Sequence, residues 1–135
     1  MRVMVDANII ISAGLFPESN VGKTLEHIAK NESLVICKYT LEELSEVFFK
    51  KFPKRVQYFY HFMDNLKYEL VDYEIDEKRK YPKIRDIDDL PLLVNAIESK
   101  VDLLVTGDKD FEEIDIDIPK IMKPREYEEK YIKQK

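Results

Sequence analysis

Four acidic residues stand beside apolar segments at widely separated points of the 135-residue chain. These residues are Asp6, Glu43, Asp89 and Asp108. Carboxylates that cluster in a fold repel one another, and one pKa rises unless a cation is present. A hard divalent cation offsets that repulsion, and Mg²⁺ and Mn²⁺ both prefer oxygen ligands. The sequence therefore predicts a Mg²⁺ or Mn²⁺ site wherever the fold brings these side chains together.

Each carboxylate also has a purely structural explanation. Asp6 could end a strand, Glu43 could complete a capping box with Thr40, and Asp108 could form a turn after Gly107. Three acids precede one apolar segment and suit a helix N-terminus through its dipole: Asp86, Asp88 and Asp89. The combination of four acids at comparable positions favours the metal site over four unrelated structural roles.

Histidine and cysteine offer no competing metal site. The one cysteine, Cys37, lies inside an apolar run, which excludes an intrachain disulfide and predicts a buried, inert thiol. His27 and His61 are isolated among apolar neighbours on predicted helices, and we expect neither to be functional.

The apolar pattern predicts the elements that position the acids. We expect strands at residues 2–6, 33–37, 102–106 and 118–122, and an edge strand or loop at 70–75. We expect helices from Ser19 or Asn20 and from Thr40, and at residues 54–68, 88–99 and 126–133. Residues 9–11 are expected to return the chain to the core.

This alternation of buried strands and helices predicts an α/β fold, a three-layer α/β/α sandwich with a mainly parallel central sheet. We expect one domain over residues 1–135. The carboxyl ends of the strands and the N-termini of the following helices share one edge of such a sheet, where ligands bind. The four carboxylates would meet there, with Glu43 in the first turn of its helix.

Composition limits the classes of protein. An apolar fraction of 44% excludes disorder, and no apolar run approaches the roughly 18 residues of a membrane span. We expect a soluble, cytoplasmic protein without a membrane partner. The net charge of −5 disfavours binding to nucleic acid through overall charge, so local basic clusters must supply any RNA contact. The clusters are Lys50, Lys51, Lys54 and Arg55, and Lys78, Arg79, Lys80, Lys83 and Arg85.

Three segments carry a family resemblance: VMVDANIIISA, TLEELSEV and DIDDLPLLVNAIESKVDLLVTGDKDF. The chain resembles the PIN-domain family of metal-dependent ribonucleases, and within it the VapC-like branch of toxin–antitoxin toxin components. The resemblance implies a parallel α/β/α sandwich, often a homodimer, with the acidic quartet at Asp6, Glu43, Asp89 and Asp108. Asn8 and Thr106 match supporting polar positions. Asp89 is preferred over its acidic neighbours because it precedes Ala96 by seven residues.

The function that follows is hydrolysis of RNA phosphodiester bonds, with Asp6, Asp89 and Asp108 as the main Mg²⁺ or Mn²⁺ ligands. Glu43 would bind a second ion or orient the attacking water. Asp110 is either a fifth contributor or an anchor of the loop to Phe111, and we favour the anchor.

Residues 78–85 are favoured over residues 50–55 for RNA contact, because they directly precede the acidic helix. Tyr and Phe of residues 48–62 could stack on bases, but their helical spacing favours packing in the core or a homodimer. A possible partner is an antitoxin protein. Two alternatives remain: a silent PIN-like module that binds RNA or protein, and a Mg²⁺-dependent phosphotransfer domain with an aspartyl phosphate on Asp6.

Overall fold

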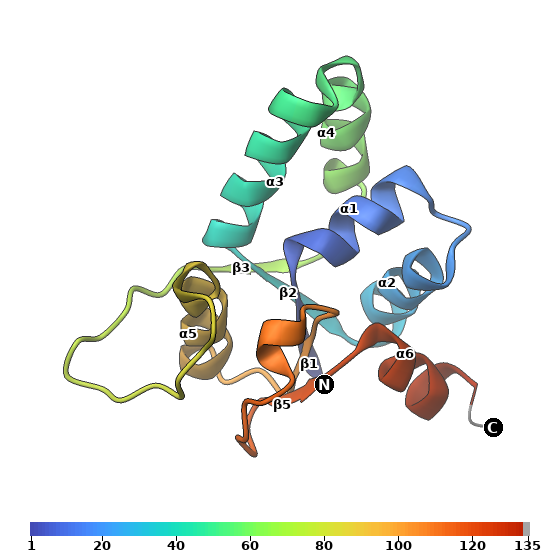
Figure 1. The fold of residues 1–135 in the computed structure, drawn as a ribbon. Coiled ribbons are helices and arrows are strands. Elements are labelled where there is room, and N and C mark those ends of the chain that lie inside the picture. Colours follow the sequence, from blue (N-terminus) through green and yellow to red (C-terminus); the bar gives the residue numbers. More distant parts are fainter. Residues whose placement is uncertain (134–135) are drawn as a thin grey trace.

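Five parallel strands form the central sheet of the computed structural model, which describes residues 1–133. In chain order the strands are β1 (Arg2–Val5), β2 (Ser33–Cys37), β3 (Glu69–Val71), β4 (Leu103–Val105) and β5 (Lys120–Met122). They lie side by side in the order β3-β2-β1-β4-β5, and each neighbouring pair is parallel (Figure 1). The predicted α/β sandwich is confirmed, and the sheet is wholly parallel. β1 is central, and β3 is the edge strand that the sequence left open.

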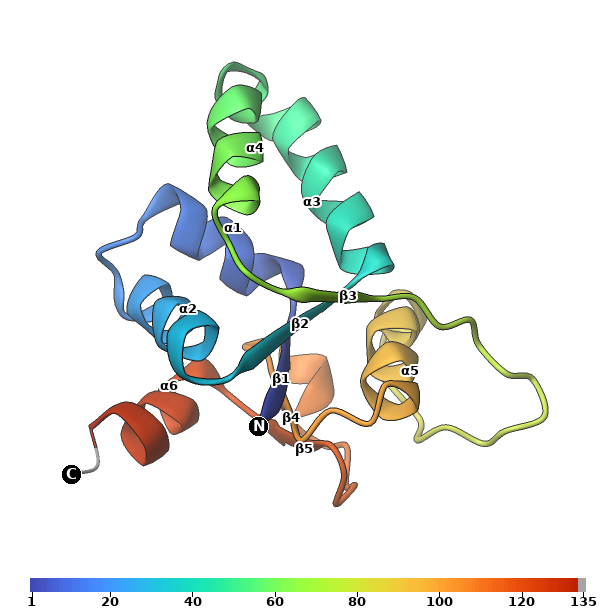
Figure 2. The ribbon, with the colours of Figure 1, turned by 180° about the vertical axis from the view of Figure 1, so that it is seen from behind.

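Helices cover both faces of the sheet. They are α1 (Ala7–Leu15), α2 (Asn20–Asn31), α3 (Lys38–Lys51), α4 (Val56–Asp64), α5 (Leu90–Glu98) and α6 (Pro124–Tyr127). Single helical turns are η1 (Pro53–Arg55), η2 (Ile87–Asp89), η3 (Lys109–Phe111) and η4 (Glu128–Ile132). Figures 1 and 2 show α5 on one side of the strands and α1, α2 and α6 on the other. The α3–α4 hairpin rises beyond the carboxyl edge of the sheet.

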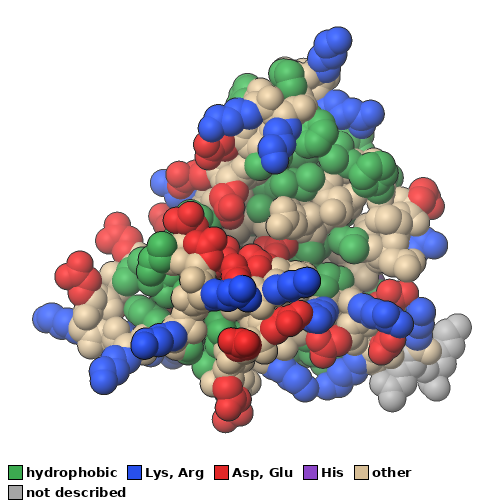
Figure 3. Space-filling view, viewed as in Figure 1, with side chains coloured by type: hydrophobic (Ala, Val, Ile, Leu, Met, Phe, Trp, Pro, Cys, Tyr) green, Lys and Arg blue, Asp and Glu red, His purple; other side chains and the backbone are tan. Residues whose placement is uncertain are grey.

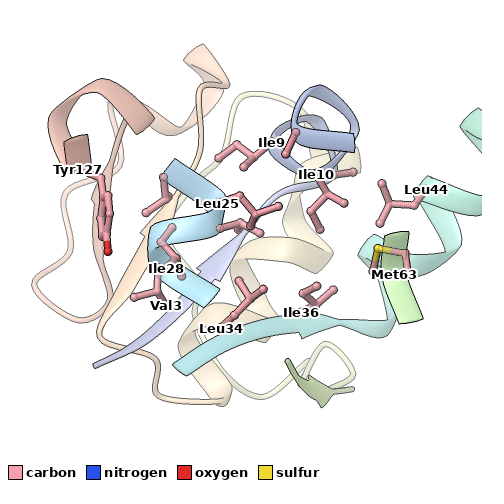
Figure 4. Packing of buried hydrophobic residues seen from close by; sticks show 14 of the residues in the cluster. Val3, Ile9, Ile10, Leu25, Ile28, Leu34, Ile36, Leu44, Met63 and Tyr127 are labelled. Carbon is pink, nitrogen blue, oxygen red and sulfur yellow. The ribbon is translucent and has the colours of Figure 1, made fainter. Parts of the chain in front are cut away.

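The two faces of the sheet bury separate apolar clusters. Side chains alternate along a strand, so Val3 and Val5 of β1 pack against α1 and α2 while Met4 packs against α5. Figure 4 shows the larger cluster, in which Ile10, Leu25 and Ile36 come from three different elements. Because β1 is buried on both faces, its carboxyl end is held firmly in place.

One helix was missed by the sequence analysis. Residues 9–11 were expected only to return the chain to the core, but they lie within α1. Three consecutive isoleucines have a low helix propensity, which hides the helix in the pattern. Asp6 supplies the start signal, because its side chain accepts the backbone N–H of Ile9 as an N-cap.

The predicted capping box at Thr40 is wrong. α3 begins at Lys38, two residues earlier, with Cys37 as the N-cap residue. Thr40 is buried inside the first turn, and its hydroxyl lies 3.3 Å from the Cys37 sulfur. Glu43 is therefore in the second turn of α3 and not in the first. The start of α2 is as predicted, because Ser19 caps it by accepting the backbone N–H of Gly22.

The remaining boundaries differ from the predicted ones by a few residues. The helix expected at 54–68 is the short turn η1 followed by α4, and the one expected at 88–99 is η2 followed by α5. The last expected helix, 126–133, begins earlier at Pro124 and continues as the wider turn η4. Within residues 1–133, none of the helices has both the length and the apolar character needed to cross a bilayer.

Candidate metal centre

Asp6 lies at the carboxyl end of the central strand and is only 6% exposed. One carboxylate oxygen accepts the backbone N–H of Ile9 at 3.0 Å, and the other accepts the hydroxyl of Thr106. Burial raises the pKa of Asp6, while these hydrogen bonds and the backbone N–H of Asn8 oppose the rise. The Asn8 side chain itself is exposed. The carboxylate is thus fixed in direction but costly to ionise.

The turn after β4 places two further acids. Thr106 directly follows β4, and its hydroxyl oxygen accepts the backbone N–H of Asp108 at 3.1 Å. Asp108 in turn caps η3 by accepting the backbone N–H of Asp110 at 2.9 Å. Thr106 therefore connects the carboxylate of Asp6 to the turn that carries Asp108, and the two strand ends form one hydrogen-bonded unit.

Asp89 faces this turn from η2, at the start of α5. Burial and the neighbouring carboxylate of Asp108 raise the pKa of Asp89 to about 7, with smaller contributions from Asp86 and Asp110. Asp89 is only partly buried, so the crowding of carboxylates matters as well as desolvation. Several acids that share one site are expected to respond in this way, and a divalent cation would offset the effect.

Glu43 approaches Asp6 from α3. It is partly buried, and its pKa is raised by burial first, then by the carboxylates of Asp6 and Glu46. Asp6 thus interacts electrostatically with both Glu43 and Asp108, and Asp108 interacts with Asp89. The structure brings all four acids of the predicted quartet to the carboxyl edge of the sheet.

A tighter group forms within this edge. Asp86, Asp89 and Asp110 each offer a carboxylate oxygen, and the three oxygens lie within 4.8 Å of one another. Oxygen donors at this spacing, one of them with a strongly raised pKa, fit a hard divalent cation. Asp88 is outside this group and is exposed. Asp110, which the sequence analysis favoured as a loop anchor, belongs to it, and Arg85 lies 3.7 Å from its carboxylate.

Sequence reasoning missed the contribution of Tyr39. Its hydroxyl donates to the backbone carbonyl of Asp88 at 2.7 Å, which joins the first turn of α3 to η2. Burial and the nearby carboxylates of Glu43, Asp88 and Asp89 raise the pKa of Tyr39 to about 12, so its proton is firmly held. No spacing in the sequence indicates this contact, because it joins residues 49 positions apart.

Histidine and cysteine lie elsewhere. The Nδ1 atom of His27 is 2.9 Å from the hydroxyl of Tyr127, and the Nε2 atom of His61 in α4 is 3.3 Å from the side-chain amide of Asn65, the residue that follows the helix. Cys37 is buried and free, as predicted. None of these residues belongs to the group of carboxylate oxygens in residues 1–133 that could hold a metal ion.

The basic cluster of residues 78–85 lies in a long loop that projects from the α5 side of the molecule (Figures 1 and 2). Arg79 forms an ion pair with Glu98 of α5, and Arg85 approaches Asp110. The exposed lysines of this loop are Lys78, Lys80 and Lys83. The second cluster, residues 50–55, lies at the tip of the α3–α4 hairpin. In Figure 3, Asp and Glu side chains gather in a hollow at the centre of the face, with Lys and Arg beside it.

Aromatic residues of the α3–α4 hairpin fall into two groups. Phe48 and Phe59 are buried and stack with their ring centroids 4.3 Å apart. Phe49, Tyr58 and Tyr60 are exposed, although the hydroxyl of Tyr58 donates to the carbonyl of Gly14. Only some of the aromatic side chains of residues 48–62 are therefore part of the core.

Comparisons with known proteins agree with this architecture. A sequence profile of the PIN domain matches residues 2–110. Among solved structures, the chain is similar to the crystal structure of VapBC2 from Rickettsia felis bound to a DNA fragment from their promoter. The match covers 90% of this chain and 97% of that chain, with 23% sequence identity and a TM-score of 0.67. At this level of identity the similarity shows a shared fold only. None of the curated protein sequences compared with the chain matches it.

Proposed function

The chain belongs to the PIN-domain family, and from that premise we propose that it is a metal-dependent endoribonuclease. The observation that supports the proposal is the convergence of four acids at one edge of the sheet, with the pKa of Asp6, Glu43 and Asp89 all raised. Such crowding weakens a fold that holds no cation, so it is best explained by a site built for one.

The residues have distinct roles in this proposal. Asp6, Asp89 and Asp108 bind Mg²⁺ or Mn²⁺, and Glu43 orients the attacking water or holds a second ion. When bound, the metal supplies an activated water for in-line attack and stabilises charge on the scissile phosphate and the leaving oxygen. Thr106 fixes the direction of the Asp6 carboxylate and favours its ionised form. Asn8 supports Asp6 from α1 through its backbone N–H, and Asp110 supports the site from η3 with a carboxylate oxygen close to that of Asp89.

RNA reaches the acidic edge along local positive charge. We assign this contact to the loop of residues 78–85, which carries exposed lysines and leads along the chain into η2. Phosphates respond to the local field, so the net charge of −5 does not exclude them. Arg79 is tied to Glu98 and contributes less than Lys78, Lys80 and Lys83.

We also propose two protein partners, an antitoxin and a second copy of this chain. VapBC2 is one of the similar solved structures, and we propose that this chain is likewise the toxin component of a toxin–antitoxin system, with an antitoxin protein as partner. We also propose a homodimer that buries the exposed Phe49 and Tyr60. Residues 1–135 would act as one nuclease domain, because β5 and α6 complete the sheet and core beyond the matched residues 2–110.

Phosphotransfer through an aspartyl phosphate is disfavoured. The segment around Asp6 has no second acidic residue before Glu18. A trapping assay separates the two functions, because a stable aspartyl phosphate on Asp6 would overturn the nuclease proposal.

Cleavage of a mixed RNA substrate with Mn²⁺ tests the proposal, with wild type beside Asp6→Asn and Asp102→Asn. Asp102 lies at the opposite end of β4 and serves as the matched control. We expect wild type and Asp102→Asn to cut, and Asp6→Asn to lose roughly 100-fold or more, the scale of one preorganised charged contact. Equal activity in all three would refute the site. Binding of RNA without cleavage across varied substrates would instead indicate a silent RNA-binding module.

A further inference from the structure

A cavity of about 390 Å³ opens directly beside the acidic edge, between η3 and the start of α6. Thr106 and Asp108 belong to both the cavity wall and the acidic site. The volume is in the range of small-molecule binding pockets. A chain of nucleotides with one phosphate at the acidic edge would therefore have a neighbouring nucleotide beside this cavity.

The lining of the cavity combines an apolar part with a charged part. The apolar part is smaller and is formed mainly by the half-buried Ile114 and Ile121, because Phe111 and Met122 are almost fully buried behind it. The charged part consists of Glu112, Glu126 and Lys123, in addition to Asp108. Apolar contact on one side and hydrogen-bonding groups on the other suit a flat ring with a polar edge, which is the character of a nucleobase.

The charges decide which part of a nucleotide fits. Three carboxylates, those of Asp108, Glu112 and Glu126, face a single amine, that of Lys123. A phosphate would meet net repulsion here, whereas an uncharged group rich in N–H donors would find acceptors. The Lys123 amine lies 2.7 Å from the carboxylate of Glu112, so one donor and one acceptor stand side by side.

Among the four RNA bases, guanine best matches this arrangement. Its Watson–Crick edge offers two adjacent donors, N1–H and N2–H, next to the acceptor O6, and unpaired bases in RNA are read on this edge. A carboxylate can accept both donors while a lysine donates to O6. Glu112 and Glu126 each have one oxygen in contact with Lys123, but Glu112 contacts the side-chain amine and Glu126 the backbone N–H, so Glu112 is the acceptor that stands beside the donor.

We propose that this cavity binds an unpaired guanine next to the scissile phosphodiester, with Glu112 and Lys123 as the specificity-determining residues. Glu112 accepts from N1–H and N2–H, and Lys123 donates to O6. The inference rests on the proposed nuclease function only for the position of the phosphate. The preference for the base itself is a binding property and is measurable without cleavage.

The test is an amide NMR titration of the full chain with guanosine, adenosine, cytidine and uridine 5′-monophosphates, without metal. All four carry the same phosphate, so repulsion from the acidic edge cancels in the comparison. We expect the guanine nucleotide to shift the amides of Phe111, Ile114 and Lys123, and to bind about fivefold or more tightly than the others. Glu112→Gln and Lys123→Gln should remove the preference, while Glu26→Gln, in an exposed ion pair of α2, should retain it.

Equal binding of the four nucleotides, shifts confined to other parts of the chain, or an unchanged preference in both cavity variants would overturn the inference. The same spectra report whether each variant is folded. Failure of RNA cleavage by the wild type would refute the nuclease function, and the titration would still decide the base preference on its own.

Discussion

Acidic residues have opposite surroundings at the two ends of the parallel strands, which form the amino edge and the carboxyl edge of the central sheet. At the amino edge, Glu69 receives two hydrogen bonds from the guanidinium of Arg2, at 3.1 and 2.8 Å, and Asp102 accepts the backbone N–H of Arg2 at 2.8 Å. At the carboxyl edge, Asp6, Glu43 and Asp89 interact with other carboxylates, and the pKa of each is raised.

This difference separates structural acids from functional ones. A carboxylate paired with a cation or an N–H group stabilises the fold. Crowded carboxylates destabilise it, and a function such as metal binding explains why they are present. The carboxyl edge is also where ligands bind in parallel α/β sheets. We therefore expect divalent cations to bind at the carboxyl edge and not at the amino edge.

The largest expected effect is that of pH on metal affinity. Binding of Mg²⁺ must displace the proton that Asp89 retains up to a pKa of about 7. We expect the affinity for Mg²⁺ to fall by close to tenfold for each pH unit below 7 and to level off above it. Isothermal titration between pH 5 and pH 8 measures this. An affinity that does not change over this range would contradict the assignment of Asp89.

Without metal, the free energy of unfolding should also depend on pH through the carboxyl group of Asp89. The unfolded chain ionises Asp89 near its ordinary pKa of about 3.9, while the folded chain keeps the proton up to about 7. Between these values the folded state binds more protons, so the free energy of unfolding falls as pH rises. Solvent screening of this partly exposed group limits the loss to about 1–2 kcal/mol. Thermal melts with and without Mg²⁺ check the sign, because the ion should reverse the loss above pH 7.

Replacing Thr106 by Val should produce the next largest effect. The buried Asp6 carboxylate loses a hydrogen bond and the turn to Asp108 loses its acceptor, so we expect metal affinity to fall about 10- to 100-fold. Thr40→Val is the matched control, because Thr40 is equally buried but contacts the Cys37 sulfur. Loss of metal affinity in both variants would attribute the effect to general destabilisation.

Tyr39→Phe should have a smaller effect on the acidic edge. It removes one hydrogen bond that joins α3 to η2, worth about 1 kcal/mol, and we expect metal affinity to fall about fivefold. Tyr58→Phe removes a comparable bond to the carbonyl of Gly14, away from the acids. Its stability should change similarly while its metal affinity stays at the wild-type value. If the two variants bind metal equally well, Tyr39 does not position the site.

The smallest effect belongs to the amino edge. Glu69→Gln breaks an ion pair between two partly exposed side chains, so we expect a loss of less than about 1 kcal/mol that disappears at high salt. Metal affinity should not change. A shift in metal affinity comparable with that of Thr106→Val would mean that the two edges are coupled and would weaken the distinction between them.

Much of this contrast could be predicted from the sequence, because strand ends and helix starts fix which side chains reach the carboxyl edge. Asp6 and Asp108 needed only the positions of two apolar strands. Glu43 was assigned to the right edge even though α3 begins two residues before the predicted Thr40. For Asp110 the sequence left two roles open and the less favoured one fits the structure, since its place beside Asp86 and Asp89 depends on how the η3 turn packs against η2.

The most direct test of the distinction between the two edges is anomalous scattering from crystals soaked in Mn²⁺, with Asp89→Asn as the comparison. A Mn²⁺ peak is expected about 2.1 Å from carboxylate oxygens of Asp89 and its acidic neighbours, with none beside Glu69, and the Asp89→Asn crystals should lose it. Absence of a peak at the carboxyl edge of the wild type, or a peak that persists in the variant, would contradict the account.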